Sequence, residues 1–67
     1  MTIGDRIKAA RIAAGLTQEQ LARAVEAGGG KQQVSNWETG FRVPRRETLT
    51  RIADALGTTP GKLMFGE

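Results

Sequence analysis

The hydrophobic residues of this chain recur three and four positions apart, which is the period of an amphipathic helix. In the first segment Thr2 and Asp5 have the spacing of a capping box, and Gly15 is suited to end a helix in the left-handed conformation. The hydrophobic positions between them are Ile3, Ile7, Ala10 and Ala14. This pattern predicts a first helix over residues 3–14.

A second segment carries the most complete helix start in the chain. Thr17 and Gln20 have capping-box spacing, and Leu16 and Leu21 occupy the two positions of a hydrophobic staple. We expect a helix from residue 18 to residue 25, or as far as residue 27. Its buried side is predicted to consist of Leu21, Ala22 and Val25.

A lengthened turn and a third helix follow. The glycines at 28–30 lose more backbone entropy on folding than other residues, so the second helix should not continue through them. Beyond them Val34 and Trp37 lie three apart and form the narrow apolar edge of a helix that ends at residue 38 or 39. The rest of its surface is rich in amides, and we call it the amide face: Lys31, Gln32, Gln33, Ser35 and Asn36.

The C-terminal third of the chain predicts a connection and two more helices. In the connection either Phe41 or Val43 is expected to cover the core, and Pro44 should redirect the chain. Helical spacing then predicts a helix over residues 46–56 and a last short helix with Pro60 at its first position. Their hydrophobic positions are Leu49, Ile52, Ala53, Leu56, Leu63 and Met64. The predicted architecture is all-α, with five helices and no strand.

Composition narrows the possible functions. With 67 residues the chain can form one small domain, residues 1–67, around a single core. It contains neither Cys nor His, which excludes disulfides, zinc fingers and catalysis by a thiol or an imidazole. We expect no cofactor, no metal and no enzymatic activity. Because hydrophobic runs are short and no signal-peptide pattern occurs, we expect a soluble cytoplasmic protein without a membrane segment.

The balance of charge points weakly to a polyanionic partner. Ten Lys and Arg residues against seven Asp and Glu residues give a net charge of +3, but many small soluble domains are mildly basic. The positions of the charges strengthen the case, because three arginines follow the third predicted helix, where a phosphate backbone would run. They are Arg42, Arg45 and Arg46.

The amide face has a chemistry that suits the edge of a base pair. A carboxamide presents a donor beside an acceptor, which matches N6 and N7 of adenine, and a Lys ammonium can reach O6 and N7 of guanine. The alternative is a plain solvated helix face, which polar residues on a small helix usually form. On the residues of this helix alone, the solvated face is favoured.

Several separate blocks of sequence favour the base-reading interpretation over a plain solvated face. In their order along the chain they resemble the phage repressor and Cro-like helix-turn-helix proteins, the lambda-repressor-like or xenobiotic-response-element family. The resembling blocks are Arg11, Gly15 to Ala22, Val34 to Gly40, Pro44, and Leu49 to Gly57. The resemblance covers nearly the whole chain and implies a compact five-helix domain whose second and third helices form a helix-turn-helix. The chain departs from the family at its glycine run, where the family has a shorter turn and usually a Ser or Thr cap.

The resemblance also implies roles for single residues. The residues implied to read bases are Lys31, Gln32, Gln33 and Asn36. The residues implied to bind phosphates are Gln18, Thr39, Arg42 and Arg45. Arg11 and Glu38 are expected to form a partly buried structural ion pair, and Trp37 is expected to belong to the core.

These expectations together describe a transcriptional regulator, most simply a repressor that occupies an operator. We expect it to bind double-stranded DNA as a two-fold homodimer on an inverted repeat, because one helix touches too few bases to specify a site. Met64 and Phe65 are expected either to cover the core or to contact a second copy. The alternative is a protein-interaction module, such as the antitoxin of a toxin-antitoxin pair.

Overall fold

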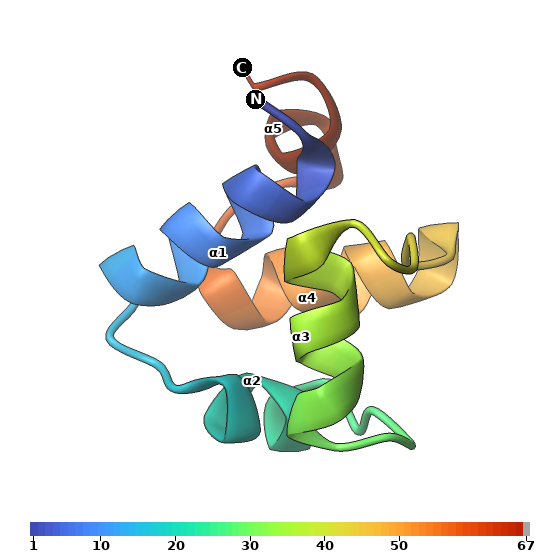
Figure 1. Cartoon of the computed structure of the whole chain (residues 1–67). Helices are drawn as coiled ribbons and strands as arrows, with labels where there is room; N and C mark the ends of the chain where they lie inside the picture. Colours follow the sequence, from blue (N-terminus) through green and yellow to red (C-terminus); the bar gives the residue numbers. More distant parts are fainter. Residues whose placement is uncertain (67) are drawn as a thin grey trace.

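Five helices make up the computed structural model of this protein, which describes residues 1–66 (Figure 1). They are α1 (Ile3–Ala13), α2 (Gln18–Ala24), α3 (Lys31–Thr39), α4 (Arg46–Leu56) and α5 (Pro60–Phe65). No strand occurs among the described residues, and the predicted all-α fold is confirmed. Helices α1 and α2 end slightly before their predicted limits. None of the helices within residues 1–66 is long and apolar enough to cross a bilayer.

Threonine side chains cap the starts of three helices, because each hydroxyl accepts a hydrogen bond from a backbone N–H of the first turn. The caps are Thr2, Thr17 and Thr59. At α1 the carboxylate of Asp5 accepts the N–H of Thr2 in return, and this backbone hydrogen bond lowers the pKa of Asp5. At α2 the side chain of Gln20 does the same for Thr17. These local contacts explain why the sequence alone located both starts.

One hydrophobic core joins all five helices. Its buried members are Ile7, Leu21, Ala22, Val25, Val34, Trp37, Leu49, Ile52, Ala53 and Leu63. The predicted periodicity is correct for most of them, although Ala14 and Met64 are exposed. Helix α3 packs mainly against two helices, with α2 against its start and α1 near its end (Figure 1).

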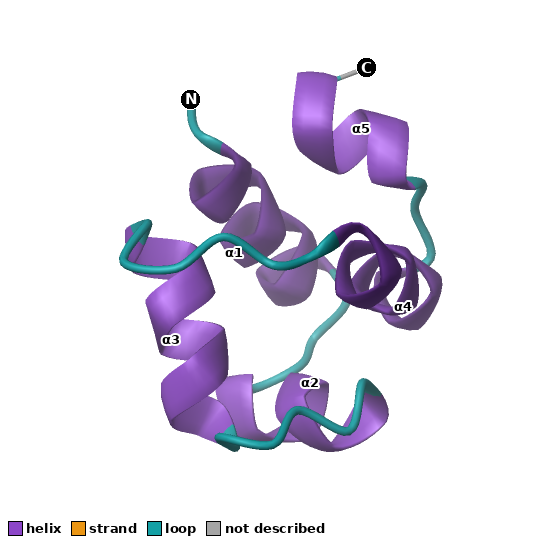
Figure 2. Cartoon of the chain, turned by 90° about the vertical axis from the view of Figure 1, so that its right-hand side faces the viewer, coloured by secondary structure: helices purple, strands orange, loops and turns teal. Residues whose placement is uncertain are grey.

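The connection between α3 and α4 corrects one expectation. Neither Phe41 nor Val43 covers the core, because these residues are 74% and 69% exposed, and the buried residue is Pro44 instead. The backbone explains the difference: the N–H of Arg42 donates to the carbonyl of Asn36 at 3.1 Å, which holds the connection against the end of α3. From there the chain runs as an extended segment to α4 (Figure 2).

The turn between α2 and α3 has two unusual backbone conformations. Glu26 has a φ of 55°, and the N–H groups of Glu26 and Ala27 donate to the carbonyls of Arg23 and Ala22. This is a Schellman motif with Glu at the position that usually holds Gly. Gly30 is the N-cap residue that precedes α3 and provides no side-chain cap. Its φ of 60° and ψ of −147° form a conformation that is essentially restricted to glycine.

Candidate nucleic-acid interface

The amide face lies on the outside of α3, while the other side of the helix belongs to the core. Val34 and Trp37 are buried, Lys31 and Gln32 are exposed, and the remaining members of the amide face are half-buried. Two of the amides contact each other, because Gln32 Nε2 donates to Asn36 Oδ1 at 3.2 Å. The structure therefore brings all four residues with an implied base-reading role onto one helix, with Gln32 the most accessible of the amides.

A partly buried cluster of polar side chains holds α3 in place. Arg11 Nε lies 2.6 Å from Glu38 Oε2, Arg11 Nη2 lies 3.2 Å from Oε1, and the Glu38 side chain is only 4% exposed. Arg11 Nη1 also donates to the carbonyl of Leu16 at 2.8 Å. The end of α1, the connection after it and the end of α3 are thus tied together at one point. We call Arg11, Gln18 and Glu38 the ion-pair cluster.

Gln18 joins this cluster rather than standing free at the start of α2. Its Nε2 donates to Glu38 Oε1 at 3.1 Å, which occupies one of the two hydrogens on that nitrogen. The second hydrogen is left for another acceptor. Gln18 and Lys31 line the same shallow depression at the junction of α2 and α3.

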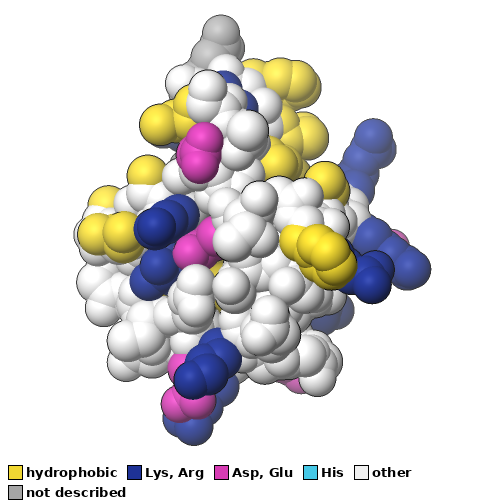
Figure 3. Space-filling model, viewed as in Figure 1, with side chains coloured by type: hydrophobic (Ala, Val, Ile, Leu, Met, Phe, Trp, Pro, Cys, Tyr) yellow, Lys and Arg dark blue, Asp and Glu magenta, His cyan; other side chains and the backbone are white. Residues whose placement is uncertain are grey.

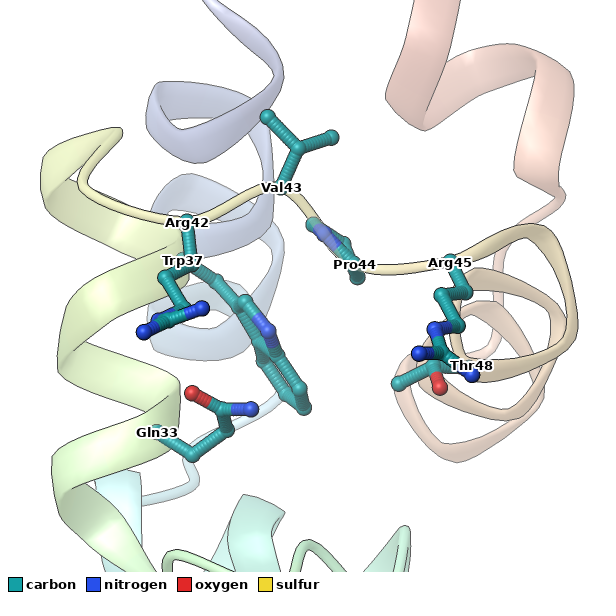
Figure 4. A pocket seen from close by; sticks show the side chains of 7 residues that line it. All are labelled: Gln33, Trp37, Arg42, Val43, Pro44, Arg45 and Thr48. Atoms are coloured by element: carbon teal, nitrogen blue, oxygen red, sulfur yellow. The ribbon is translucent and has the colours of Figure 1, made fainter.

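A hollow of about 380 Å³ lies on the other side of the amide face, between α3 and the start of α4 (Figure 4). The residues that line this basic hollow are Gln33, Trp37, Arg42, Val43, Pro44, Arg45 and Thr48. Gln33 and Arg42 face Arg45 and Thr48 across the opening, with the Trp37 ring between them (Figure 4). The two guanidinium groups and the hydroxyl suit an anionic, hydrogen-bond-accepting group such as a phosphate, while Gln33 lies where the hollow meets the amide face.

Two residues of this region have contacts that the sequence did not indicate. The hydroxyl of Thr39 donates to the carbonyl of Asn36 at 3.3 Å, so its hydrogen is used within α3. Thr48 was not expected at the interface, yet it lines the basic hollow. No signal in the sequence marks Thr48, because its contact depends on how α4 sits relative to α3.

The surface around α3 has an uneven distribution of charge. Over α3 the side chains are mostly polar and uncharged, while Lys and Arg side chains gather at the right-hand edge, over the start of α4 (Figure 3). Arg42, Arg45 and Arg46 are all exposed. A neutral hydrogen-bonding face beside a cationic edge is the arrangement expected where bases are read and phosphates are bound.

Comparison with known proteins identifies the family. A family model described as a helix-turn-helix domain matches residues 2–64, which is nearly the whole chain. The chain belongs to the helix-turn-helix domain family. The curated relative ImmR, an HTH-type transcriptional regulator of Bacillus subtilis (strain 168), is 31% identical over 64 residues. The match covers 96% of this chain and 49% of ImmR, so the chain spans about half the length of that relative.

Solved structures of helix-turn-helix domains confirm the fold. A crystal structure of the P22 c2 repressor in complex with the synthetic operator 9T, in the presence of Tl⁺, has a TM-score of 0.92. It is 28% identical and covers 100% of this chain and 98% of that one. The solution structure of the P22 c2 DNA-binding domain has a TM-score of 0.88 and 28% identity, over 94% of this chain and 80% of that one. The resemblance to phage repressors is therefore confirmed.

Proposed function

We propose that this helix-turn-helix domain binds double-stranded DNA sequence-specifically, with α3 in the major groove, and acts as a repressor-like transcriptional regulator. The observation that carries the proposal is the superposition of the whole chain on a repressor bound to its operator. The surface of α3 agrees with it, because Lys31 and Gln32 are exposed beside a cationic edge. Repressors of this architecture insert the second helix of the helix-turn-helix, which is α3 here, into the major groove.

In the proposed complex the amide face of α3 contacts bases, and the basic hollow beside it contacts phosphates. Lys31, Gln32, Gln33 and Asn36 are the proposed base-reading residues. Arg42 and Arg45 are the strongest phosphate candidates, because both are exposed and line the basic hollow. Gln18 can bind a phosphate with its second amide hydrogen without leaving Glu38, whereas Thr39 would first have to break its bond to Asn36.

The proposed complex is a homodimer on an inverted repeat with half-sites about 34 Å apart. Met64 and Phe65 were expected either to cover the core or to contact a second copy. Covering the core does not fit, because these residues are 40% and 70% exposed. Hydrophobic side chains also gather around α5 at the top of the molecule (Figure 3). We therefore assign these two residues to the contact with a second copy.

The test separates positioning contacts from base-reading contacts. Arg42→Ala should weaken binding to every sequence alike and reduce the salt dependence, because a phosphate contact carries no sequence information. Gln32→Ala should cost about 1–3 kcal/mol on the preferred sequence and relax the preference at one base pair. Lys8→Ala, which removes an exposed positive charge from α1, is the matched control and should change binding little.

The measurement is selection of preferred sites from random duplexes, followed by titration of the selected site at several salt concentrations. If the folded domain bound all duplexes equally, sequence-specific regulation would be contradicted, and a protein-interaction module would be favoured. Protection of a single isolated half-site at saturation would contradict the homodimer.

A further inference from the structure

Two amides of α3 are joined before any DNA is bound. Gln32 and Asn36 lie four residues apart, which places them one above the other on the helix. Gln32 Nε2 donates to Asn36 Oδ1 at 3.2 Å. This contact uses one hydrogen of the Gln32 nitrogen and one lone pair of the Asn36 oxygen.

The groups that remain on Gln32 suit a single base. A carboxamide nitrogen carries two hydrogens, so Gln32 keeps one N–H as well as its carbonyl oxygen. A donor and an acceptor on one side chain are what N7 and N6 of adenine require for a bidentate contact in the major groove. The bond to Asn36 therefore leaves Gln32 with one donor and one acceptor for a base.

Asn36 is the better anchored of the two residues. It is half-buried, and its backbone carbonyl accepts the N–H of Arg42 at 3.1 Å and the hydroxyl of Thr39 at 3.3 Å, which fixes the backbone from which its carboxamide projects. Gln32, by contrast, is exposed on the first turn of α3, next to the glycine turn. A long exposed side chain loses rotamer freedom on binding, and a contact that orders it beforehand reduces that loss.

From these observations we infer that Asn36 is a positioning residue for Gln32, and that the two amides recognise one A·T base pair as a unit. In this arrangement Gln32 contacts adenine. Asn36, grouped above with the base-reading residues, contributes to base reading through Gln32 and does not contact a base pair of its own. The inference rests on the proposed function, because it concerns how α3 distinguishes sequences.

The neighbouring Gln33 offers a matched comparison. It has the same carboxamide and also belongs to the amide face, but its side chain lines the basic hollow on the other side of α3 (Figure 4). It should therefore act independently of Asn36.

A double-mutant cycle on the purified domain tests the inference, with the preferred duplex and all single base-pair changes as ligands. Gln32→Ala and Asn36→Ala should each reduce the preference at the same base pair by about tenfold, and the double variant should lose no more than the larger single effect. Gln33→Ala combined with Asn36→Ala should give independent, multiplying effects. Circular dichroism checks that each variant is folded.

Asn36→Asp separates positioning from a general effect of the substitution. Aspartate keeps an oxygen that can accept from Gln32, so the preference at that base pair should survive, while its negative charge weakens binding to all sequences alike. The inference is overturned if Asn36→Ala relaxes a different base pair and multiplies with Gln32→Ala. A wild-type domain without any sequence preference would instead overturn the proposed function itself, and this inference with it.

Discussion

The two halves of α3 differ in how firmly the rest of the molecule holds them. The C-terminal half carries the buried Trp37 and Glu38, and α1 approaches it so closely that only a glycine, Gly4, fits between. The N-terminal half begins at Gly30 without a side-chain cap and exposes Lys31 and Gln32. One helix therefore has an anchored end and an accessible end.

The difference shows how a small domain can present a helix to a partner. At the anchored end the ion-pair cluster of Arg11, Gln18 and Glu38 fixes the direction of α3. The N-terminal end packs on α2 through the buried Val34, but its Lys31 and Gln32 side chains remain exposed. If this is correct, substitutions at the anchored end should mainly change stability, and those at the accessible end should change it less.

The largest effect is expected from Arg11→Ala. It leaves the carboxylate of Glu38, 4% exposed, with Gln18 as its remaining hydrogen-bonding side chain, and loss of a buried ion-pair partner costs about 3–5 kcal/mol. The control is Arg23→Ala, whose pair with Glu19 spans 3.5 Å between exposed side chains and should contribute about 0–1 kcal/mol. Urea unfolding measures both, and equal destabilisation by the two variants would contradict the anchoring role.

A smaller loss is expected from Gly4→Ala. A Cβ at this position would overlap the carbonyl oxygens of Trp37 and Glu38, so α1 would have to move away from α3, at about 1–3 kcal/mol. Gly61→Ala is the control, because the nearest atom to its Cβ would be 4.0 Å away. It should be neutral or stabilising by up to about 1 kcal/mol. A Gly4→Ala variant that melts at the wild-type temperature would show that the close approach is unimportant.

At the accessible end, Gly30→Ala should destabilise the domain by about 1–2 kcal/mol, because alanine is strained at this φ and ψ although no atom blocks its Cβ. Gly28→Ala should have little effect, because the methyl group would lie in open space and the backbone φ at residue 28 is not positive. Thermal unfolding of the pair compares them directly. Similar melting temperatures would mean that the turn adapts.

The smallest of the four effects is expected from Glu26→Gly, and it is a gain in stability. Relief of the left-handed conformation at φ 55° is partly offset by the entropy of glycine, which leaves a net stabilisation of about 0.5–1 kcal/mol. Glu26→Ala removes the same charge but keeps the strain, so it should give no gain. If both variants were equally stabilised, the removal of charge rather than the backbone would be responsible.

The helices themselves could be predicted because their signals are local. Thr17 and Gln20 form the capping box that their spacing indicated, and Val34 and Trp37 face the core as their period required. The contact between Arg11 and Glu38 was expected only through the resemblance to phage repressors, since nothing in the spacing of residues 27 apart brings them together.

The details around α3 depended on the tertiary structure. Hydrophobicity favoured Phe41 or Val43 as the core cover, but the hydrogen bond between Arg42 and Asn36 directs that segment so that Pro44 is buried instead. Likewise, Gln18 meets Glu38 and Thr48 lines the basic hollow only because three helices cross at particular places. Helix caps and hydrophobic periods depend on residues a few positions apart, so helix positions and core-facing residues could be predicted from the sequence. Contacts between distant side chains depend on how the helices pack, and a single sequence does not specify that packing locally.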